Sequence, residues 1–320
     1  MAANGSSRAR IGLVLEQPLV TRASDPYQYG AYQGLLRAAG DLHVQAKAVA
    51  PSPTATDQYL APFSYLARQR YDLVIAIGFL QVNALARAAR QFPRIKFALL
   101  DATRGDVPGR PKNLEGTVFR TEQPAYLAGF LAARMADRGP PPHVVSSVGG
   151  IPIPPVQAYI AGFQAGAKRA DPKIKLLNAY SNNFLNPTGC THIARDQIAH
   201  GSQVVFDVAG ECGVGALQTA KRSGVFGIGV DVDQSYLSKK YILTSVVKNL
   251  DVAVYDVAKR LVGGRLRTGS DLRFDLRNHG VGLGKFSPEV PRALRRELIR
   301  LAAQIEQGKI VVPATLSRSH

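Results

Sequence analysis

The chain contains no tryptophan, and cysteine and methionine occur only twice each among its 320 residues. Two cysteines, Cys190 and Cys212, are too few for a disulfide-stabilised scaffold, and they lack the spacing of a zinc site. No apolar run approaches the roughly 18 residues that a membrane-spanning helix requires. The first ten residues, MAANGSSRAR, are polar and show no apolar core of a signal peptide. These absences exclude a disulfide scaffold, a zinc finger and a helical integral membrane protein.

Motifs of catalysis are also missing. The six histidines are dispersed without metal-ligand spacing, and neither a G-x-S-x-G elbow nor a Walker A loop occurs. The stretch GECGVG (210–215) has its glycines in the wrong order for a dinucleotide site. It suits a tight loop whose backbone amides approach a ligand, which makes Gly210 and Glu211 candidate contacts. Cys212 has no histidine partner for nucleophilic chemistry. We therefore expect a protein that is not an enzyme and uses no cofactor or metal.

The charge balance is strongly basic, with a formal net charge of +17. The lysines and arginines are spread along the chain, and no dense basic block alternates with aromatic residues. No helix-turn-helix or finger signature accompanies them. This distribution indicates a generally basic surface, and we expect no nucleic-acid partner.

Short apolar runs alternate with helical patterns along most of the chain, which is typical of parallel β-α-β units. In the first series the strand runs are 11–16, 44–50, 73–78, 96–101 and 116–120, with helices near 28–39, 55–69 and 80–91. In the second series the strand runs are 144–150, 174–180, 204–210 and 225–231, with helices near 154–169, 188–199 and 213–222. A helix near 122–136 and the proline-rich break RGPPPH (138–143) separate them. The chain length also favours two domains.

The C-terminal part continues the pattern with a strand at 242–247 and a helical run at 249–264 that ends in two glycines. A turn-rich stretch follows to about 286. A helix from about 288 to 307 and a short strand, IVVPATL (310–316), complete the expected elements.

Ligands of open parallel sheets bind at the carboxyl ends of the strands. The residues at these predicted ends are Glu16, Gly78, Asp101, Gly149, Gly150, Gly210 and Asp231. The stretch SDPYQYGAYQG (24–34) follows the first strand at the same edge and carries three tyrosines. We interpret it as a loop that presents aromatic surface to a ligand.

Several stretches resemble the basic membrane protein family, which comprises substrate-binding lipoproteins of ABC importers and includes purine nucleoside receptors. The matching stretches are VIAIGFLQVNAL (74–85), FALLD (97–101), FRTEQPAYLAGFLAA (119–133), GGIPIPPVQAYIAGFQAGAK (149–168), FDVAGECGVGALQTAK (206–221), IGVDVDQ (228–234) and ILTSVVKNLDVAVYDVAK (242–259). Their order and spacing together are specific, and the resemblance covers about residues 11–315.

The resemblance implies an α/β protein with the type I periplasmic-binding fold, in which two Rossmann-like lobes with parallel sheets surround a ligand cleft. The N-terminal lobe would comprise 9–119 and about 248–280. The C-terminal lobe would comprise about 120–247 and 281–316, with hinge crossovers near 120, 247 and 281.

The resemblance also implies a nucleoside site. The stacking ring of the first lobe falls on Tyr27, where the family has phenylalanine, and the base-reading amide falls on Gln28, where it has asparagine. Glu16 takes the place of an aspartate at the end of the first strand. The remaining implied ligand contacts are Asp101, the second ring Phe184, the ribose-binding Asp231, and the cation Lys248.

The chemistry of a purine nucleoside suits these residues. Two aromatic rings suit a flat purine, since base stacking contributes roughly 1–3 kcal/mol per base. One carboxylate accepts both protons of a ribose diol, and a lysine compensates its buried charge. Alternatives remain open: Asp101 and Asp231 as helix caps, Phe184 as core, Lys248 as a hinge bridge, and Tyr29 and Tyr32 as helix packing.

The two cysteines fall at one edge of the second sheet, because Cys190 opens a helix and Cys212 follows a strand. We expect them to form a disulfide that fixes the Phe184 loop.

The resulting hypothesis is a monomeric extracytoplasmic receptor that binds adenosine, guanosine or inosine and passes it to an ABC permease. We expect a lipid anchor on the cell membrane, whose signal segment is absent from this sequence. The alternatives are a cytoplasmic sensor or regulator on the same fold and a nucleoside-processing enzyme.

Overall fold

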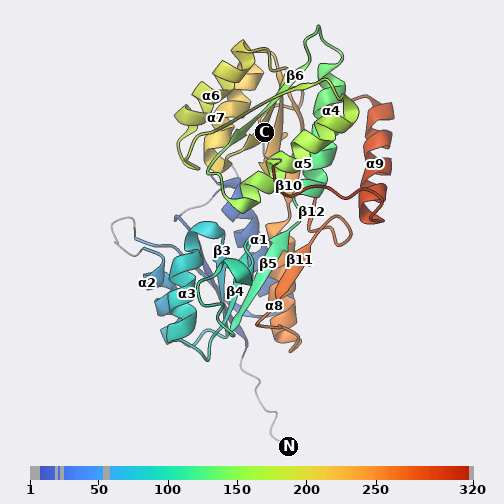
Figure 1. Ribbon diagram of the computed structural model, residues 1–320. Helices are drawn as coiled ribbons and strands as arrows, with labels where there is room; N and C mark the ends of the chain where they lie inside the picture. The colour runs from blue at the N-terminus through green and yellow to red at the C-terminus, as the bar shows by residue number, and fades with distance from the viewer. Residues whose placement is uncertain (1–7, 19–20, 22–24, 53–57, 317–320) are drawn as a thin grey trace, which may run out of the picture. The chain divides into compact units, whose positions relative to one another are not determined.

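A computed structural model describes residues 8–18, 21, 25–52 and 58–316 (Figure 1). The chain divides into two compact units. Unit 1 combines Met1–Ala23, Tyr27–Val118 and Leu250–Arg273, and unit 2 combines Ser24–Pro26, Phe119–Asn249 and Phe274–His320. The chain therefore passes between the units at 118/119, 249/250 and 273/274, compared with the expected crossovers near 120, 247 and 281.

Unit 1 contains a six-stranded sheet in the order β11-β5-β4-β3-β1-β2. Its strands are β1 (Arg10–Val14), β2 (Gln45–Val49), β3 (Leu73–Ile77), β4 (Lys96–Leu100), β5 (Leu114–Phe119) and β11 (Asp271–Phe274). Its helices are α1 (Pro26–Asp41), α2 (Leu60–Arg68), α3 (Val82–Gln91) and α8 (Leu250–Val262), with 3-10 turns η1 (Phe79–Gln81) and η2 (Arg104–Asp106). The pairings from β2 through β5 are parallel.

Helices cover both faces of the unit 1 sheet (Figure 1). On one face, α2 and α3 pack over the central strands and bury residues such as Phe63, Leu66 and Leu85. On the other face, α1 approaches α8 so closely that a Cβ on Gly34 would lie 2.5 Å from the backbone oxygen of Asp251. Burial on both faces explains why the strand sequences are continuously apolar rather than alternating.

Unit 2 repeats this arrangement with a six-stranded sheet in the order β12-β10-β9-β8-β6-β7. Its strands are β6 (Val144–Gly149), β7 (Lys175–Tyr180), β8 (Val204–Val208), β9 (Phe226–Asp231), β10 (Ile242–Lys248) and β12 (Val281–Leu283). Its helices are α4 (Glu122–Ala136), α5 (Pro154–Ala170), α6 (Pro187–Ala199), α7 (Gly210–Arg222) and α9 (Arg292–Glu306). All pairings are parallel except the one between β10 and β12, which is antiparallel.

The helices of unit 2 form pairs: α4 with α5 on one face of the sheet, and α6 with α7 on the other (Figure 1). Glycines allow the first pair to approach closely. A Cβ on Gly129 would lie 1.9 Å from the Phe163 oxygen, and one on Gly166 would lie 1.9 Å from the Tyr126 oxygen. The outer helix α9 packs its buried leucines against α4.

Four expectations about local structure were wrong. Residues 310–316 form no strand, because Pro313 lacks an N–H and Val311 is 85% exposed. The turn-rich stretch before 286 contains the edge strands β11 and β12. Tyr27 lies in the first turn of α1 rather than in a loop.

The fourth error concerns GECGVG, which is not a loop. It forms the first turns of α7, because β8 already ends at Val208. The turn between strand and helix is therefore only Ala209, followed by Gly210 with φ +59°.

The helical stretch expected at about 55–69 begins at Leu60, and residues 53–57 lie outside the described residues.

Candidate functional site

In unit 1, polar side chains gather at the carboxyl ends of β1, β3 and β4. Tyr27, from the start of α1, donates its hydroxyl proton to Asp101 Oδ2 at 3.1 Å. A Cβ on Gly78 would lie 3.0 Å from the Tyr27 hydroxyl oxygen and 3.3 Å from Glu16 Oε1. Gly78 has φ +78°, a conformation that favours glycine. The structure thus brings together four predicted residues: Glu16, Tyr27, Gly78 and Asp101.

Gln28 is also close to this group, but its side chain points into the protein. It is 1% exposed, and its Oε1 accepts the backbone N–H of Glu16. This bond fixes the chain where it leaves β1, two residues after the strand ends. The reading of a base edge by Gln28 remains a prediction.

Asp101 has an unusual backbone conformation, with φ +65° and an exposed fraction of 8%. Non-glycine residues rarely adopt positive φ, and such positions cluster at functional sites. The Asp101 N–H donates to Thr117 Oγ1 at 3.2 Å, so the neighbouring strand β5 holds this conformation in place. The backbone therefore fixes the carboxylate at the strand end.

Tyr59 belongs to the same neighbourhood, although sequence reasoning missed it. Burial raises the pKa of its phenol to about 12, with a further contribution from the Glu16 carboxylate. Because Tyr59 directly precedes α2, its position depends on how that helix packs, and no motif marked it.

In unit 2, the centre of the candidate site is Asp231, at the end of β9. It has φ +64° and is 7% exposed. Its Oδ1 accepts the hydroxyl proton of Tyr159 at 3.1 Å and lies 3.8 Å from Lys248 Nζ. Tyr159 comes from α5, and Lys248 ends β10, the strand next to β9.

Lys248 is 4% exposed, and two aromatic rings accompany its ammonium group. Nζ lies 5.1 Å from the centroid of the Tyr159 ring and 5.8 Å from that of Phe119. A cation over aromatic faces gains electrostatic attraction, most strongly when water is excluded. The Asp231–Lys248 pair is thus a buried ion pair with two aromatic rings near its ammonium group. Neither Tyr159 nor Phe119 was identified from the sequence.

The loop between β7 and α6 places the ring of Phe184 against Gly150. A Cβ on Gly150 would lie 2.3 Å from the Phe184 ring, so only glycine leaves room for the ring. The Phe184 carbonyl accepts the Cys212 N–H at 2.8 Å, and the Asn183 side chain accepts the N–H groups of Leu185 and Asn186. Phe184 is half-buried, which is compatible with both a packing role and a ligand-facing role.

Cys190 and Cys212 form a disulfide, as predicted. The bond joins the first turns of α6 and α7, and both cysteines are fully buried. Because Cys212 also bonds the Phe184 carbonyl, the disulfide lies directly under the Phe184 loop. Gly210 and Glu211, the other predicted contacts, open α7 beside it.

Two carboxyl groups near these elements have raised pKa values. Burial raises the pKa of Glu211, and the neighbouring Asp25 carboxylate adds to the rise. Burial also raises the pKa of Asp207 well above its usual range; the Ala209 N–H works against the rise, and the nearby Asp231 carboxylate adds to it. Asp207 is fully buried in β8, and its Oδ2 has no hydrogen-bond partner among the described residues.

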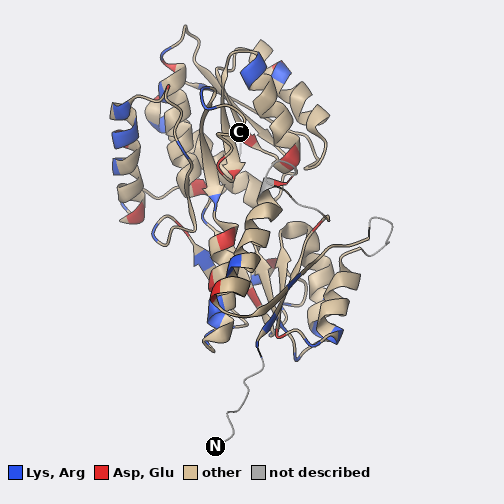
Figure 2. Ribbon diagram, turned by 180° about the vertical axis from the view of Figure 1, so that it is seen from behind, with Lys and Arg blue, Asp and Glu red and all other residues tan. Residues whose placement is uncertain are grey.

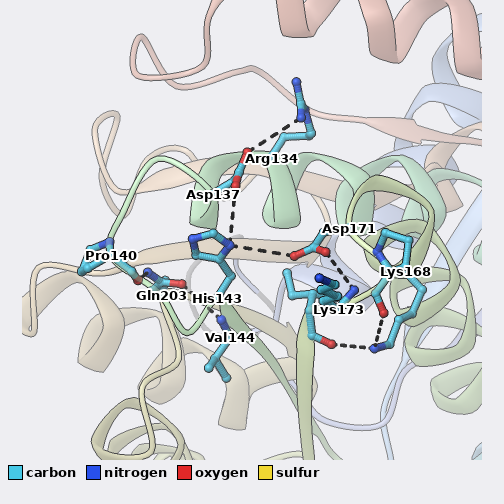
Figure 3. A network of polar contacts seen from close by, with 11 residues as sticks. Arg134, Asp137, Pro140, His143, Val144, Lys168, Asp171, Lys173 and Gln203 are labelled. Atoms are coloured by element: carbon cyan, nitrogen blue, oxygen red, sulfur yellow. Dashed lines mark hydrogen bonds and ion pairs between the residues drawn. The ribbon is translucent and has the colours of Figure 1, made fainter.

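A second polar cluster lies where β6 begins, at the opposite end of the strand from Gly149 (Figure 3). His143 Nδ1 lies 3.5 Å from Asp137 Oδ1 and 3.8 Å from Asp171 Oδ2. The two aspartates are the C-cap residues of α4 and α5, so the histidine joins two helix ends. Gln203 bonds the Pro140 oxygen and the Val144 N–H in the same cluster. We interpret it as a structural tie within unit 2.

Comparison with solved structures identifies the fold. A solute-binding protein of an ABC transporter system from Aeropyrum pernix superposes with a TM-score of 0.83 over 97% of this chain and 94% of that one, at 24% sequence identity. Two mostly parallel α/β sheets with this strand order confirm the expected periplasmic-binding fold.

Sequence comparison identifies the family. Basic membrane protein B of Borrelia garinii subsp. bavariensis is 29% identical over 303 residues, which cover 92% of this chain and 87% of that protein. An uncharacterized lipoprotein of Pyrococcus horikoshii is 32% identical, covering 79% of this chain and 63% of that one. The family model described as ABC transporter substrate-binding protein PnrA-like matches residues 20–315. The chain belongs to this Bmp family of substrate-binding proteins, which are not enzymes.

Proposed function

We propose that the chain is the extracytoplasmic receptor of an ABC importer and that it binds a purine nucleoside of the adenosine, guanosine or inosine class. The observation that carries this proposal is the paired arrangement of Asp101 with Tyr27 and of Asp231 with Tyr159. Each pair holds a carboxylate at a strand end, in the left-handed conformation and mostly buried. Such groups bind hydrogen-bond donors, and a nucleoside carries donors on its ribose and on its base.

Asp231 is the proposed ribose-binding group. One carboxylate accepts hydrogen bonds from both hydroxyls of a vicinal diol. Hydrogen bonds to a charged acceptor are stronger than those to a neutral one. Lys248 compensates the charge that Asp231 carries when solvent is excluded. The hydroxyl of Tyr159 occupies one further lone pair of Oδ1, which limits the directions open to the ligand.

The base is assigned to the aromatic residues Tyr27 and Phe184, with Asp101 at its polar edge. Stacking on aromatic rings contributes about 1–3 kcal/mol per base and depends little on base identity. Asp101 accepts hydrogen bonds from the amino or imino N–H groups that purines present at their edge. The unit 1 group contains the carboxylates of Glu16 and Asp101, so a phosphorylated ligand would meet repulsion there. A neutral nucleoside therefore fits better than a nucleotide.

The proposed partner is the permease of an ABC transporter, to which a monomeric receptor delivers its ligand after closure about a hinge. The similar protein from Pyrococcus horikoshii is a lipoprotein. We infer the same kind of anchor for this chain, with the protein on the outer side of the cell membrane. No helix within the described ranges is long and apolar enough to span a bilayer.

Calorimetric titration of the purified chain tests the proposal. The panel should contain adenosine, guanosine, inosine, the free bases, the corresponding nucleotides and pentose sugars. We expect saturable heat with at least one purine nucleoside and weaker or no binding of its nucleotide. Absence of binding to every nucleoside would overturn the ligand assignment.

A pair of matched variants tests the site itself. Asp231→Asn removes the charge that accepts the ribose protons, and affinity should fall by about 10- to 150-fold, the range for a hydrogen bond to a charged group. Asp196→Asn removes the same charge from an exposed position on α6 and should leave affinity unchanged. Equal affinities for the two variants would remove Asp231 from the site.

A further inference from the structure

The outer helix of unit 2, α9, carries a line of three exposed arginines. Arg292, Arg296 and Arg300 are all exposed, and none forms an ion pair or hydrogen bond with a described residue. Their spacing of four places them on one face of the helix. Blue bands along α9 mark its basic residues in Figure 2. Arg295, in contrast, donates to the backbone oxygens of Val290 and Ser287.

This charge pattern opposes the stability of the helix. The first turn of α9 contains Arg292 and Arg295 and no acidic residue, and the last turn contains no basic residue and ends in Glu306. The helix macrodipole favours the reverse order, acids at the N-terminus and bases at the C-terminus. Like charges four residues apart also repel each other. An anionic counterpart outside the helix would offset both effects.

An apolar side chain lies within the same line. Ile299 is 66% exposed, and its spacing of seven from Arg292 and three from Arg296 places it on the arginine face. The opposite face buries Leu294, Leu298 and Leu301 against the unit. The exposed face of α9 therefore combines positive charge with one large apolar group.

We propose that this arginine face of α9 docks on a membrane surface that carries anionic lipid headgroups. Arginines bind phosphate groups through several N–H donors. Each Lys or Arg near an anionic leaflet contributes enough to change binding about fivefold. Exposed Ile299 enters the interfacial layer, as apolar residues of surface-bound helices do. The formal net charge of +17 attracts the chain to such a surface, and α9 gives that attraction a defined face.

The test measures partition of the purified chain onto vesicles and uses no nucleoside, so its result is separate from that of the proposed function. Vesicles of phosphatidylcholine containing about 30% phosphatidylglycerol are compared with pure phosphatidylcholine. We expect binding to the anionic vesicles that weakens with salt. The triple variant Arg292→Gln/Arg296→Gln/Arg300→Gln should bind them about 100-fold more weakly, the product of three fivefold losses.

A charge-matched control separates a docking face from general attraction. Arg68→Gln/Arg94→Gln/Lys96→Gln removes three positive charges from exposed positions of unit 1. This control should stay within about threefold of wild type, because it leaves α9 intact. Ile299→Ser should weaken vesicle binding less than the triple variant does. The size of this loss should not depend on the salt concentration.

Folding of the α9 variant is checked by urea unfolding. The triple variant should be at least as stable as wild type, since it removes charges that oppose the helix dipole. Equal losses in the α9 variant and the control would overturn the proposal, as would equal binding of wild type to both kinds of vesicle. Binding to nucleic acid but not to vesicles, lost in the α9 variant alone, would overturn it in favour of a nucleic-acid surface.

Discussion

Unit 1 and unit 2 place an aspartate at the same point of the same topology. Asp101 follows β4 and Asp231 ends β9, and each of these strands is third in the order of its sheet. Both residues have positive φ, and each accepts a hydroxyl proton from a tyrosine on the helix after the first strand of its unit. The correspondence of Tyr27 with Tyr159 shows that the two sites are versions of one arrangement.

The difference lies in the next strand of each sheet. In unit 2, β10 supplies Lys248, 3.8 Å from Asp231. In unit 1, β5 supplies the neutral Thr117, which bonds the backbone N–H of Asp101. One fold therefore places a lysine beside the aspartate in one unit and a threonine in the other. The difference teaches that equivalent strand ends hold their aspartates by different contacts: an ion pair to the carboxylate of Asp231, and a hydrogen bond to the backbone of Asp101.

The largest expected effect is on stability, through Asp231→Ala. This variant leaves the buried Lys248 without its carboxylate, and breaking a buried ion pair costs about 3–5 kcal/mol of unfolding free energy. Asp101→Ala removes the acceptor of the Tyr27 hydroxyl and should cost about 1 kcal/mol, the value of one hydrogen bond. Urea unfolding monitored by circular dichroism measures both.

The double variant Asp231→Leu/Lys248→Met provides the control. It removes both charges and should recover much of the stability that Asp231→Ala loses, because apolar replacements of buried pairs are tolerated. Equal losses for Asp231→Ala and Asp101→Ala would show that the two units do not differ in the way described.

The disulfide should have the second-largest effect, and it is confined to unit 2. Replacing both Cys190 and Cys212 with alanine removes a constraint on a loop with a sequence separation of 22. The expected cost is about 3 kcal/mol. Hydrogen exchange should show faster opening of α6 and α7, with the helices of unit 1 unaffected.

Reduction of the wild-type protein is the matching experiment. Dithiothreitol should lower the midpoint of wild-type unfolding and leave that of the alanine variant unchanged. A wild-type protein that responds no more than the variant would contradict a stabilising role of the bond.

The tyrosine hydroxyls test the correspondence of the units through ligand binding. Tyr27→Phe and Tyr159→Phe each remove one donor to a carboxylate and should weaken nucleoside binding by about fivefold, roughly 1 kcal/mol. Because Asp231 is assigned to the ribose diol, the loss caused by Tyr159→Phe should shrink with a 2′-deoxynucleoside. The loss caused by Tyr27→Phe should not depend on the 2′-hydroxyl. Calorimetry with both ligands distinguishes the two, and identical responses would contradict the assignment of sugar and base.

The smallest expected effect concerns pH and the buried Asp207. Its pKa is raised in the folded protein, so the folded state retains a proton that the unfolded state releases. Stability therefore falls as pH rises from the unfolded value of about 4 through the folded pKa. Asp207→Asn keeps an acceptor for the Ala209 N–H and has no proton to lose. The difference in Tm between Asp207→Asn and wild type should grow as pH rises above about 4, and a constant difference would contradict the buried proton.

Much of the fold could be predicted from the sequence because it depends on local patterns. Continuously apolar runs such as 73–77 become strands buried on both faces, and the strand ends carrying Asp101 and Asp231 follow directly from those runs. The cysteine pair was predictable for the same reason, since helix starts and strand ends share one edge of a parallel sheet. Strands β11 and β12 were not, because four and three residues at a sheet edge have no pattern of their own.

The sequence by itself determined the two α/β units, the family resemblance and the acids at the strand ends, because these follow from periodicity and from short segments read in order. Only the tertiary structure decided which groups surround those acids. Tyr159 lies 72 positions before Asp231 and Lys248 lies on a neighbouring strand, so their contacts depend on how α5 and β10 pack. Packing also directs the Gln28 side chain into the protein, where its Oε1 accepts the backbone N–H of Glu16. Side-chain neighbours are set by contacts between distant segments, and no local pattern contains that information.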